Sequence, residues 1–250
     1  MALLYLTSTA YPLATFSTGY LVDLFCPEDP VSLFSNLITS LRASPSTGSR
    51  FSTVLHIYEP VSEQSFFVNS ILLAQRLEEL DEFPIFLRLG SPIEVLQKIP
   101  DRLNDVLHSL RGLLHPSNAG IPLSYTLPAD IPMDMTVALA GVLLDYAVAY
   151  MPIPSREHVL SGVPLDFYKS TLTWPRPNAD AINGDVRENQ WSIMKFSCPA
   201  QLAENHPALT PTKIINRIQV MFQKRLSILD DRTLKINTEH TTKTLAHVAF

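Results

Sequence analysis

The feature that most constrains this fold is an apolar block over residues 133–153. Within it, Asp134 and Asp145 enclose an uncharged run of about ten residues, well short of the roughly twenty that a helix needs to cross a bilayer. We therefore predict a helix over residues 133–144 that is buried in a protein core, followed by a buried strand over residues 147–151. A membrane span is not expected.

Length and composition favour one folded domain. The 250 residues are 46% hydrophobic and 17% charged, so the chain can bury a sizeable core and lacks the composition of a disordered protein. We expect a single α/β domain over residues 1–250. The polar stretch over residues 175–189 contains glycine and proline, and we expect it to be a flexible, exposed loop.

The first half of the sequence alternates between expected strands and helices. The strands are expected at residues 19–25, 51–58 and 85–89, and the helices at residues 29–42, 62–80 and 91–112. Each helix begins at a residue that can cap it, namely Asp29 before Pro30, Ser62, and Ser91 with Glu94. Pro100 should kink or split the third helix. The alternation favours crossover connections and a partly parallel sheet.

The second half predicts mainly strands. Residues 147–151, 163–172 and 191–197 are expected as antiparallel additions to the same sheet, and Thr210-Pro211 opens a helix to about residue 229. Residues 233–237 and 243–248 are expected to form a terminal hairpin around a polar turn. The predicted class is α/β, with a mixed, partly parallel sheet, helices on its faces and antiparallel strands in the second half.

Charge and cysteine content limit the partners and the location. The net charge of −5 and the even spread of 19 basic residues argue against nucleic-acid binding. The chain has two cysteines and no Asn-x-Ser/Thr acceptor, and its N-terminus lacks the basic region and cleavage pattern of a signal peptide. We expect a soluble cytoplasmic protein with reduced thiols. Of the classes of partner, a protein is the one that remains, and the sequence does not determine the oligomeric state.

Familiar catalytic and cofactor motifs are absent from the sequence. It contains no Gly-x-Gly-x-x-Gly, no Gly-Lys-Ser/Thr, no His-Glu-x-x-His, no Cys-x-x-Cys and no Gly-x-Ser-x-Gly. Its seven histidines show no metal-ligand spacing. The sequence therefore predicts no bound cofactor.

Acidic residues at the ends of the first two expected strands are the main candidates for chemistry. Asp23, Glu28 and Asp29 lie near the end of the first strand, and Glu59 ends the second. If these strands are neighbours, Glu28, Asp29 and Glu59 could hold Mg²⁺, and Asp23 and Glu59 could act in catalysis. The alternative is structural, since Asp29 caps a helix and Glu28 and Glu59 can simply face solvent.

Two further groups have a chemical and a structural interpretation. Cys26 precedes the Asp29 cap, where a thiol can become nucleophilic, but Cys26 and Cys198 both fit the role of small apolar residues. Lys213, Arg217 and Lys224 fall on one side of the last expected helix. This basic stripe fits either a solvated helix face or a site for an acidic partner.

Three segments of the sequence resemble a known family. They are ALAGVLLDYAVAYMP at residues 138–152, SGVPLDFYKS at residues 161–170 and KFSCP at residues 195–199. They are similar to the uncharacterised eukaryotic family of the human chromosome 1 open reading frame seventy-four protein. The resemblance implies a shared fold, and it transfers no functional residue to this chain.

Two functional hypotheses follow. In the first, the chain is a non-catalytic cytosolic protein-interaction domain, because its ionisable groups are scattered and no catalytic motif is present. In the second, it is a metal-assisted hydrolase with Mg²⁺ held by carboxylates at the C-terminal ends of the first two strands.

Overall fold

The computed structural model describes residues 16–23, 25–80, 84–115, 120–153, 160–175, 188–228 and 233–246. The chain divides into two compact units, Met1–Val159 with Phe250, and Leu160–Ala249. Helices and mixed sheets together confirm the predicted α/β class. The expected single domain stays a prediction, because compactness does not show whether the two units unfold together. The loop expected at 175–189 falls almost entirely outside the described residues.

The first unit is built around a four-stranded sheet of order β1-β3-β2-β6. Its strands are β1 (Gly19–Val22), β2 (Val54–Glu59), β3 (Gln64–Asn69) and β6 (Ser124–Thr126). β3 is antiparallel to both β1 and β2, whereas β6 is parallel to β2. The two strands that the sequence predicts first, β1 and β2, are therefore separated by β3.

The helix predicted over residues 62–80 is wrong in its first half. Residues after Glu63 form β3, and the helix α4 (Ser70–Glu78) begins only after Asn69. The Asn69 side chain, not that of Ser62, caps this helix by accepting hydrogen bonds from the Ile71 and Leu72 amides. Aromatic and β-branched residues suit a pleated surface, so cross-strand pairing with β2 outweighs the helical spacing here.

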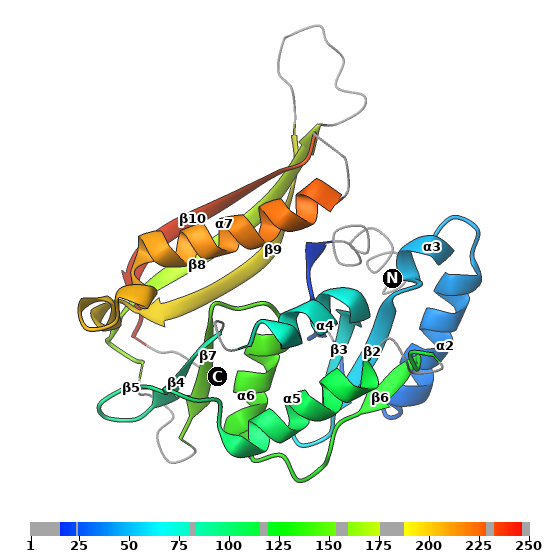
Figure 1. Cartoon of the computed structure of the whole chain (residues 1–250), viewed down its shortest axis with the longest axis horizontal. Coiled ribbons are helices and arrows are strands. Elements are labelled where there is room, and N and C mark those ends of the chain that lie inside the picture. The colour runs from blue at the N-terminus through cyan, green and yellow to red at the C-terminus, as the bar shows by residue number, and fades with distance from the viewer. Residues whose placement is uncertain are drawn as a thin grey trace, which may run out of the picture. The chain divides into compact units, whose positions relative to one another are not determined.

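Helices cover both faces of this sheet (Figure 1). The main core joins the sheet to α4, α5 (Asp101–Leu113) and α6 (Met133–Leu143), and a second cluster joins its other face to α2 (Pro30–Ala43) and α3 (Gly48–Phe51). The helix predicted at residue 133 is confirmed, and it is buried as expected. No helix among the described residues is long and apolar enough to span a membrane.

A second sheet in the first unit has the order β5-β4-β7. β4 (Ile85–Leu89) and β7 (Val148–Pro152) are parallel, and the short β5 (Glu94–Val95) is antiparallel to β4. The antiparallel pairing expected for residues 147–151 is therefore wrong. The helix expected from Ser91 is wrong, because Glu94 pairs with β4 and α5 starts only after Pro100. Proline at the cap position avoids the missing hydrogen bond that it would cause inside the helix.

The second unit is a three-stranded antiparallel sheet of order β10-β8-β9 (Figure 1). The antiparallel pairing is as expected, but these strands form a sheet of their own and are not additions to the sheet of the first half. Its strands are β8 (Pro164–Pro175), β9 (Glu188–Pro199) and β10 (Lys235–Thr244), and the short turns η1 (Ala200–Glu204) and η2 (Pro207–Leu209) lead into the helix α7 (Pro211–Ile228). α7 covers one face of the sheet and buries Ile214, Ile218 and Phe222. The expected terminal hairpin is wrong, since the residues predicted as its turn continue β10 without interruption.

Candidate functional site

The structure does not bring the predicted carboxylates together as a metal site. β3 lies between β1 and β2, so Asp23 and Glu59 follow strands that are not neighbours. Asp23 and Glu28 are exposed, whereas Glu59 is buried. Among the described residues, no group of three or more His, Cys, Asp or Glu side chains could hold a metal ion.

Glu59 is occupied in closing the turn between β2 and β3. Its Oε1 accepts a hydrogen bond from the Val61 amide at 2.6 Å, and its Oε2 accepts one from the Ser62 amide at 2.9 Å. The Ser62 hydroxyl donates to the same Oε2. The turn continues through Glu63, whose φ of 55° lies in the left-handed region. Buried polar groups need such partners, so the geometry gives Glu59 a structural role.

Asp29 performs the capping role predicted for it. Its Oδ1 accepts a hydrogen bond from the Ser32 amide at 3.0 Å, and Pro30 occupies the first helical position. Hydrogen bonding to Ser32 lowers the pKa of the Asp29 carboxyl, as expected for a carboxylate at a helix N-terminus.

The two cysteines occupy opposite environments. Cys26 is exposed, with its Sγ 3.8 Å from the Glu63 carbonyl oxygen. Cys198 is buried on β9, and burial, with a smaller contribution from Asp166, raises the pKa of its thiol to about 12. Cys198 is therefore a neutral thiol at physiological pH, which does not suit it to act as a nucleophile.

A buried histidine was missed by the sequence analysis. His56 on β2 is 0% exposed, and its ring packs against Phe34 and Phe67 with centroid distances of 4.8 and 5.9 Å. Its Nδ1 lies 2.6 Å from the Ser124 hydroxyl, and its Nε2 has no hydrogen-bond partner among the described residues. Burial lowers the pKa of His56 to about 4. The ring is therefore neutral at pH 7. Its burial results from packing against residues distant in the sequence, so the sequence alone does not indicate it.

Asp145 is a second buried polar residue, at the end of α6. Its φ is 63°, and its two carboxylate oxygens accept hydrogen bonds from the amide and hydroxyl of Thr18, at 2.7 and 2.6 Å. Gly19 follows, and a side chain at that position would collide with the Leu143 carbonyl. Asp145 thus ties the start of β1 to the C-terminus of α6.

The covered face of the second unit's sheet holds a polar cluster. Asp166 Oδ1 accepts a hydrogen bond from the Thr242 hydroxyl at 2.6 Å, and it lies 2.9 Å from His240 Nε2 without the alignment of a hydrogen bond. Tyr168 stacks on Phe196 at 5.0 Å and lies 5.2 Å from the His240 ring.

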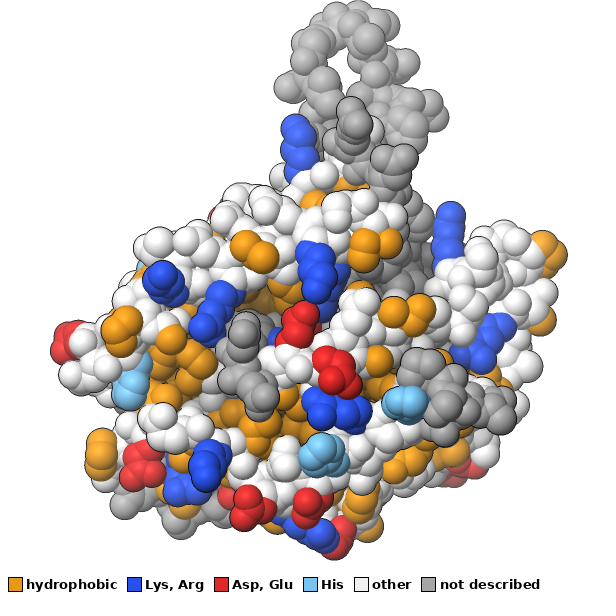
Figure 2. Space-filling model, in the orientation of Figure 1, with side chains coloured by type: hydrophobic (Ala, Val, Ile, Leu, Met, Phe, Trp, Pro, Cys, Tyr) orange, Lys and Arg blue, Asp and Glu red, His pale blue; other side chains and the backbone are white. Residues whose placement is uncertain are grey.

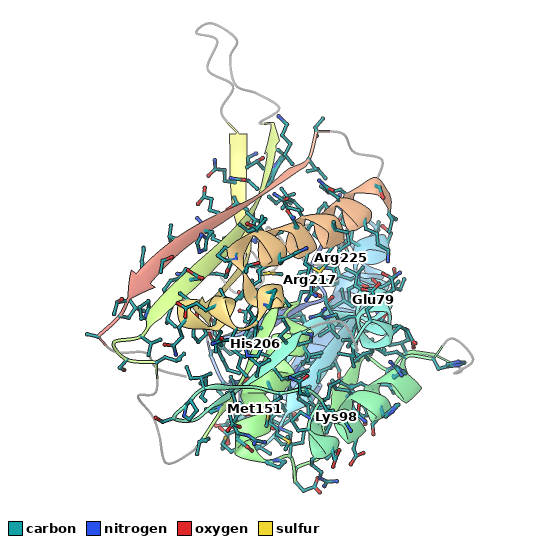
Figure 3. All side chains as sticks on the ribbon, turned by 60° about the vertical axis from the view of Figure 1, so that its left-hand side comes forward. Glu79, Lys98, Met151, His206, Arg217 and Arg225 are labelled. Atoms are coloured by element: carbon teal, nitrogen blue, oxygen red, sulfur yellow. The ribbon has the colours of Figure 1, made fainter. Side chains whose placement is uncertain are left out.

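The other face of this sheet carries exposed basic residues, although Leu165 at one end of it is buried, and we call it the lysine face. Figure 3 shows side chains projecting from the face that is turned away from α7. The lysine face carries the exposed residues Lys169, Lys195, Lys235, Lys243 and Glu239. Lys169 lies directly opposite Lys195 on β9 and opposite Glu239 on β10. Among the described residues, none of these lysines forms an ion pair.

The basic stripe predicted on the last helix is exposed on α7. Lys213, Arg217 and Lys224 all face solvent, and Figure 2 shows basic side chains along the part of the surface formed by this helix. Arg225 is instead buried, with its guanidinium carbon 5.7 Å from the centre of the Phe222 ring (Figure 3).

No protein-family model, curated protein or solved structure matches this chain. The similarity to the chromosome 1 open reading frame seventy-four family therefore stays an expectation from the sequence alone.

Proposed function

We propose that the chain is a non-catalytic cytosolic protein-interaction domain, and that the lysine face binds an acidic segment of a partner protein. The observation that carries the proposal is the direct pairing of two exposed lysines, Lys169 and Lys195, on neighbouring strands. Like charges that face each other across two strands destabilise a sheet by roughly 0.2–1 kcal/mol. An anionic group bound between the two ammonium groups would attract both and so offset their mutual repulsion.

The spacing of the lysines favours an extended ligand. Lys235 lies opposite Thr173, Lys243 lies opposite Leu165, and Lys169 lies midway between those two residues along β8. Four residues of strand span about 13 Å, so basic groups recur at that interval along the sheet. The carboxylates of an extended acidic segment running along β8 could therefore meet all of them.

The charge distribution along the chain supports an acidic partner. Residues 160–249 contain eleven lysines and arginines against eight aspartates and glutamates, whereas residues 1–159 contain eight against sixteen. The basic residues are thus concentrated in the second unit, and the even spread expected from the sequence does not hold, although the whole chain is negative. Complementary charge speeds association and selects partners more than it adds affinity, so we expect a salt-sensitive interaction.

The test uses a fluorescent peptide of alternating glutamate and threonine, with a lysine–threonine peptide as control, and follows anisotropy with the full chain. We expect the acidic peptide to bind and rising salt to weaken binding. The double variant Lys169→Glu/Lys195→Glu should weaken it by at least about tenfold, because two attractive contacts become repulsive.

The matched control is Lys213→Glu/Lys224→Glu, which changes the same charge on exposed residues of α7. Equal losses in the two double variants would indicate a general charge effect and overturn the proposed face. Tighter binding of a single-stranded oligonucleotide than of the acidic peptide would overturn the assignment of a protein partner.

A further inference from the structure

β10 is an edge strand of the second unit's sheet, and no described strand pairs with its outer side (red in Figure 1). It pairs with β8 at every position from Lys235 to Thr244 without a register shift. Outside that ladder, residues 235–244 form no backbone–backbone hydrogen bond with any described residue. The strand contains neither proline nor glycine. Unpaired N–H and C=O groups on such an edge are available to another strand.

The opposite edge of the sheet is less suited to pairing. β9 has a register shift against β8 between Ser170 and Thr171, and it ends in Pro199. Bulges and prolines are devices that bend an edge strand or remove its donors. β10 carries neither, so it is the better template for an added strand.

The charges on β10 follow a pattern that is complementary to itself. Lys235, Glu239 and Lys243 are four residues apart, so their side chains share one face of the sheet. When two copies of a strand pair in antiparallel fashion about a two-fold axis, a residue on one side of the axis faces the residue of the other copy that lies equally far on the other side. A glutamate flanked by lysines at equal intervals can then face lysine in both copies at once.

We propose that two copies of this chain associate through β10, with Thr241 opposite Thr241 on the two-fold axis. Residues 238–244 of the copies would then pair, and Glu239 of each copy would face Lys243 of the other. Two registers overlap over nine residues. The one centred on Glu239 is disfavoured, because it sets Glu239 against itself and Lys235 against Lys243. The one centred on His240 brings no unlike charges together, since Glu239 then faces Thr241 and Lys243 faces Asn237. A further register sets Glu239 against Lys235 but pairs only residues 235–239.

The dimer should be weak. Strand pairing over this length buries less surface than the roughly 1,000 Å² typical of a stable interface, so we expect a dissociation constant on the order of 10–100 µM. Sedimentation equilibrium of the full chain, from about 5 to about 500 µM at low salt, covers this range.

The charge pair provides a set of matched variants. Glu239→Lys and Lys243→Glu each turn two attractive pairs into repulsive ones, and each should weaken association by at least about tenfold. The double variant Glu239→Lys/Lys243→Glu restores unlike charges and should dimerise like the wild type. An equimolar mixture of the two single variants should also dimerise, which would show that both are folded.

Lys235→Glu is the control, since Lys235 lies outside the paired segment on the same strand and face. It should leave the dissociation constant unchanged. A wild-type chain that stays monomeric across the whole range overturns the proposal, as does a mixture that fails to recover association. A loss with Lys235→Glu equal to that with Lys243→Glu overturns the register. These variants also change charges of the lysine face, so that face is tested separately by Lys169→Glu/Lys195→Glu, which leaves β10 unchanged.

Discussion

His56 should make the stability of the protein depend on pH below neutrality. Its pKa is about 4 in the folded protein against 6.5 for an ordinary histidine, because burial disfavours the charged ring. The unfolded chain therefore binds a proton that the folded chain does not, in the window between these two values. The stabilisation is complete above pH 6.5 and is lost as the pH falls toward 4.

The size of this effect follows from the shift. This difference between the folded and unfolded pKa of His56 corresponds to about 3 kcal/mol of unfolding free energy in total. About 2 kcal/mol of it is lost between pH 7 and pH 5. Carboxylates also titrate at low pH, so the contribution of His56 must be isolated by a difference. His56→Phe keeps a ring against Phe34 and Phe67, and its partner Ser124 is only half-buried.

The assay is urea unfolding of wild type and His56→Phe at several pH values. We expect the free energy of unfolding of the variant to gain about 2 kcal/mol relative to the wild type between pH 7 and pH 5. His108→Gln, on the exposed side of α5, controls for the loss of a surface histidine. A difference that is constant with pH, or an NMR titration of the His56 ring near pH 6.5, would refute the reasoning.

Three further predictions follow from single contacts. In the same urea titration, Asp145→Ala should lower the free energy of unfolding by about 2–4 kcal/mol, because the buried Thr18 amide loses its acceptor. Asp145→Asn should lower it less, because asparagine tolerates a positive φ and still offers an oxygen acceptor. In a thiol-reagent assay, Cys26 should react rapidly in the native protein and the buried, neutral Cys198 only after unfolding. Millimolar Mg²⁺ should leave the melting temperature unchanged, since the Glu59 carboxylate is already held by the turn; a clear rise would revive the hydrolase hypothesis.

Local signals in the sequence predicted much of the fold. The helices that begin with Asp29-Pro30 and Thr210-Pro211 were correctly located, because a cap and a proline act on the residues beside them. The strand β3 was missed because its residues also fit a helical period, and pairing with β2 decides between the two. β10 was interpreted as two strands because its polar centre resembles a turn, although Thr238 in that centre is buried.

The candidate site depended on information that the sequence lacks. The metal hypothesis required β1 and β2 to be neighbours, and strand order is set by tertiary packing. The lysine face was equally hidden, since Lys169 and Lys195 are far apart in the chain and meet only through the register of β8 and β9. Asp145 was noted only as the residue that ends the apolar run, and its burial depends on Thr18, over a hundred positions earlier.

The two proposals predict that acidic ligand and dimer should stabilise each other. Pairing through β10 would join two lysine faces into one surface. Lys243 of each copy would pair with Glu239 of the other, so Lys169, Lys195 and Lys235 of each copy would remain without a neutralising partner. An acidic segment that spans both faces would reduce their mutual repulsion and contact twice as many lysines. Because such coupling is reciprocal, the ligand should strengthen the dimer by the same factor by which the dimer strengthens binding of the ligand.

Adding the glutamate–threonine peptide to the sedimentation experiment tests this coupling. We expect the dissociation constant of the dimer to fall several-fold with a peptide long enough to cross both faces, and not with one that covers a single face. A dimer that dissociates when the long peptide is added would show that ligand and second copy compete for β10. In that case the acidic segment would pair with the strand edge instead of lying across the lysine face.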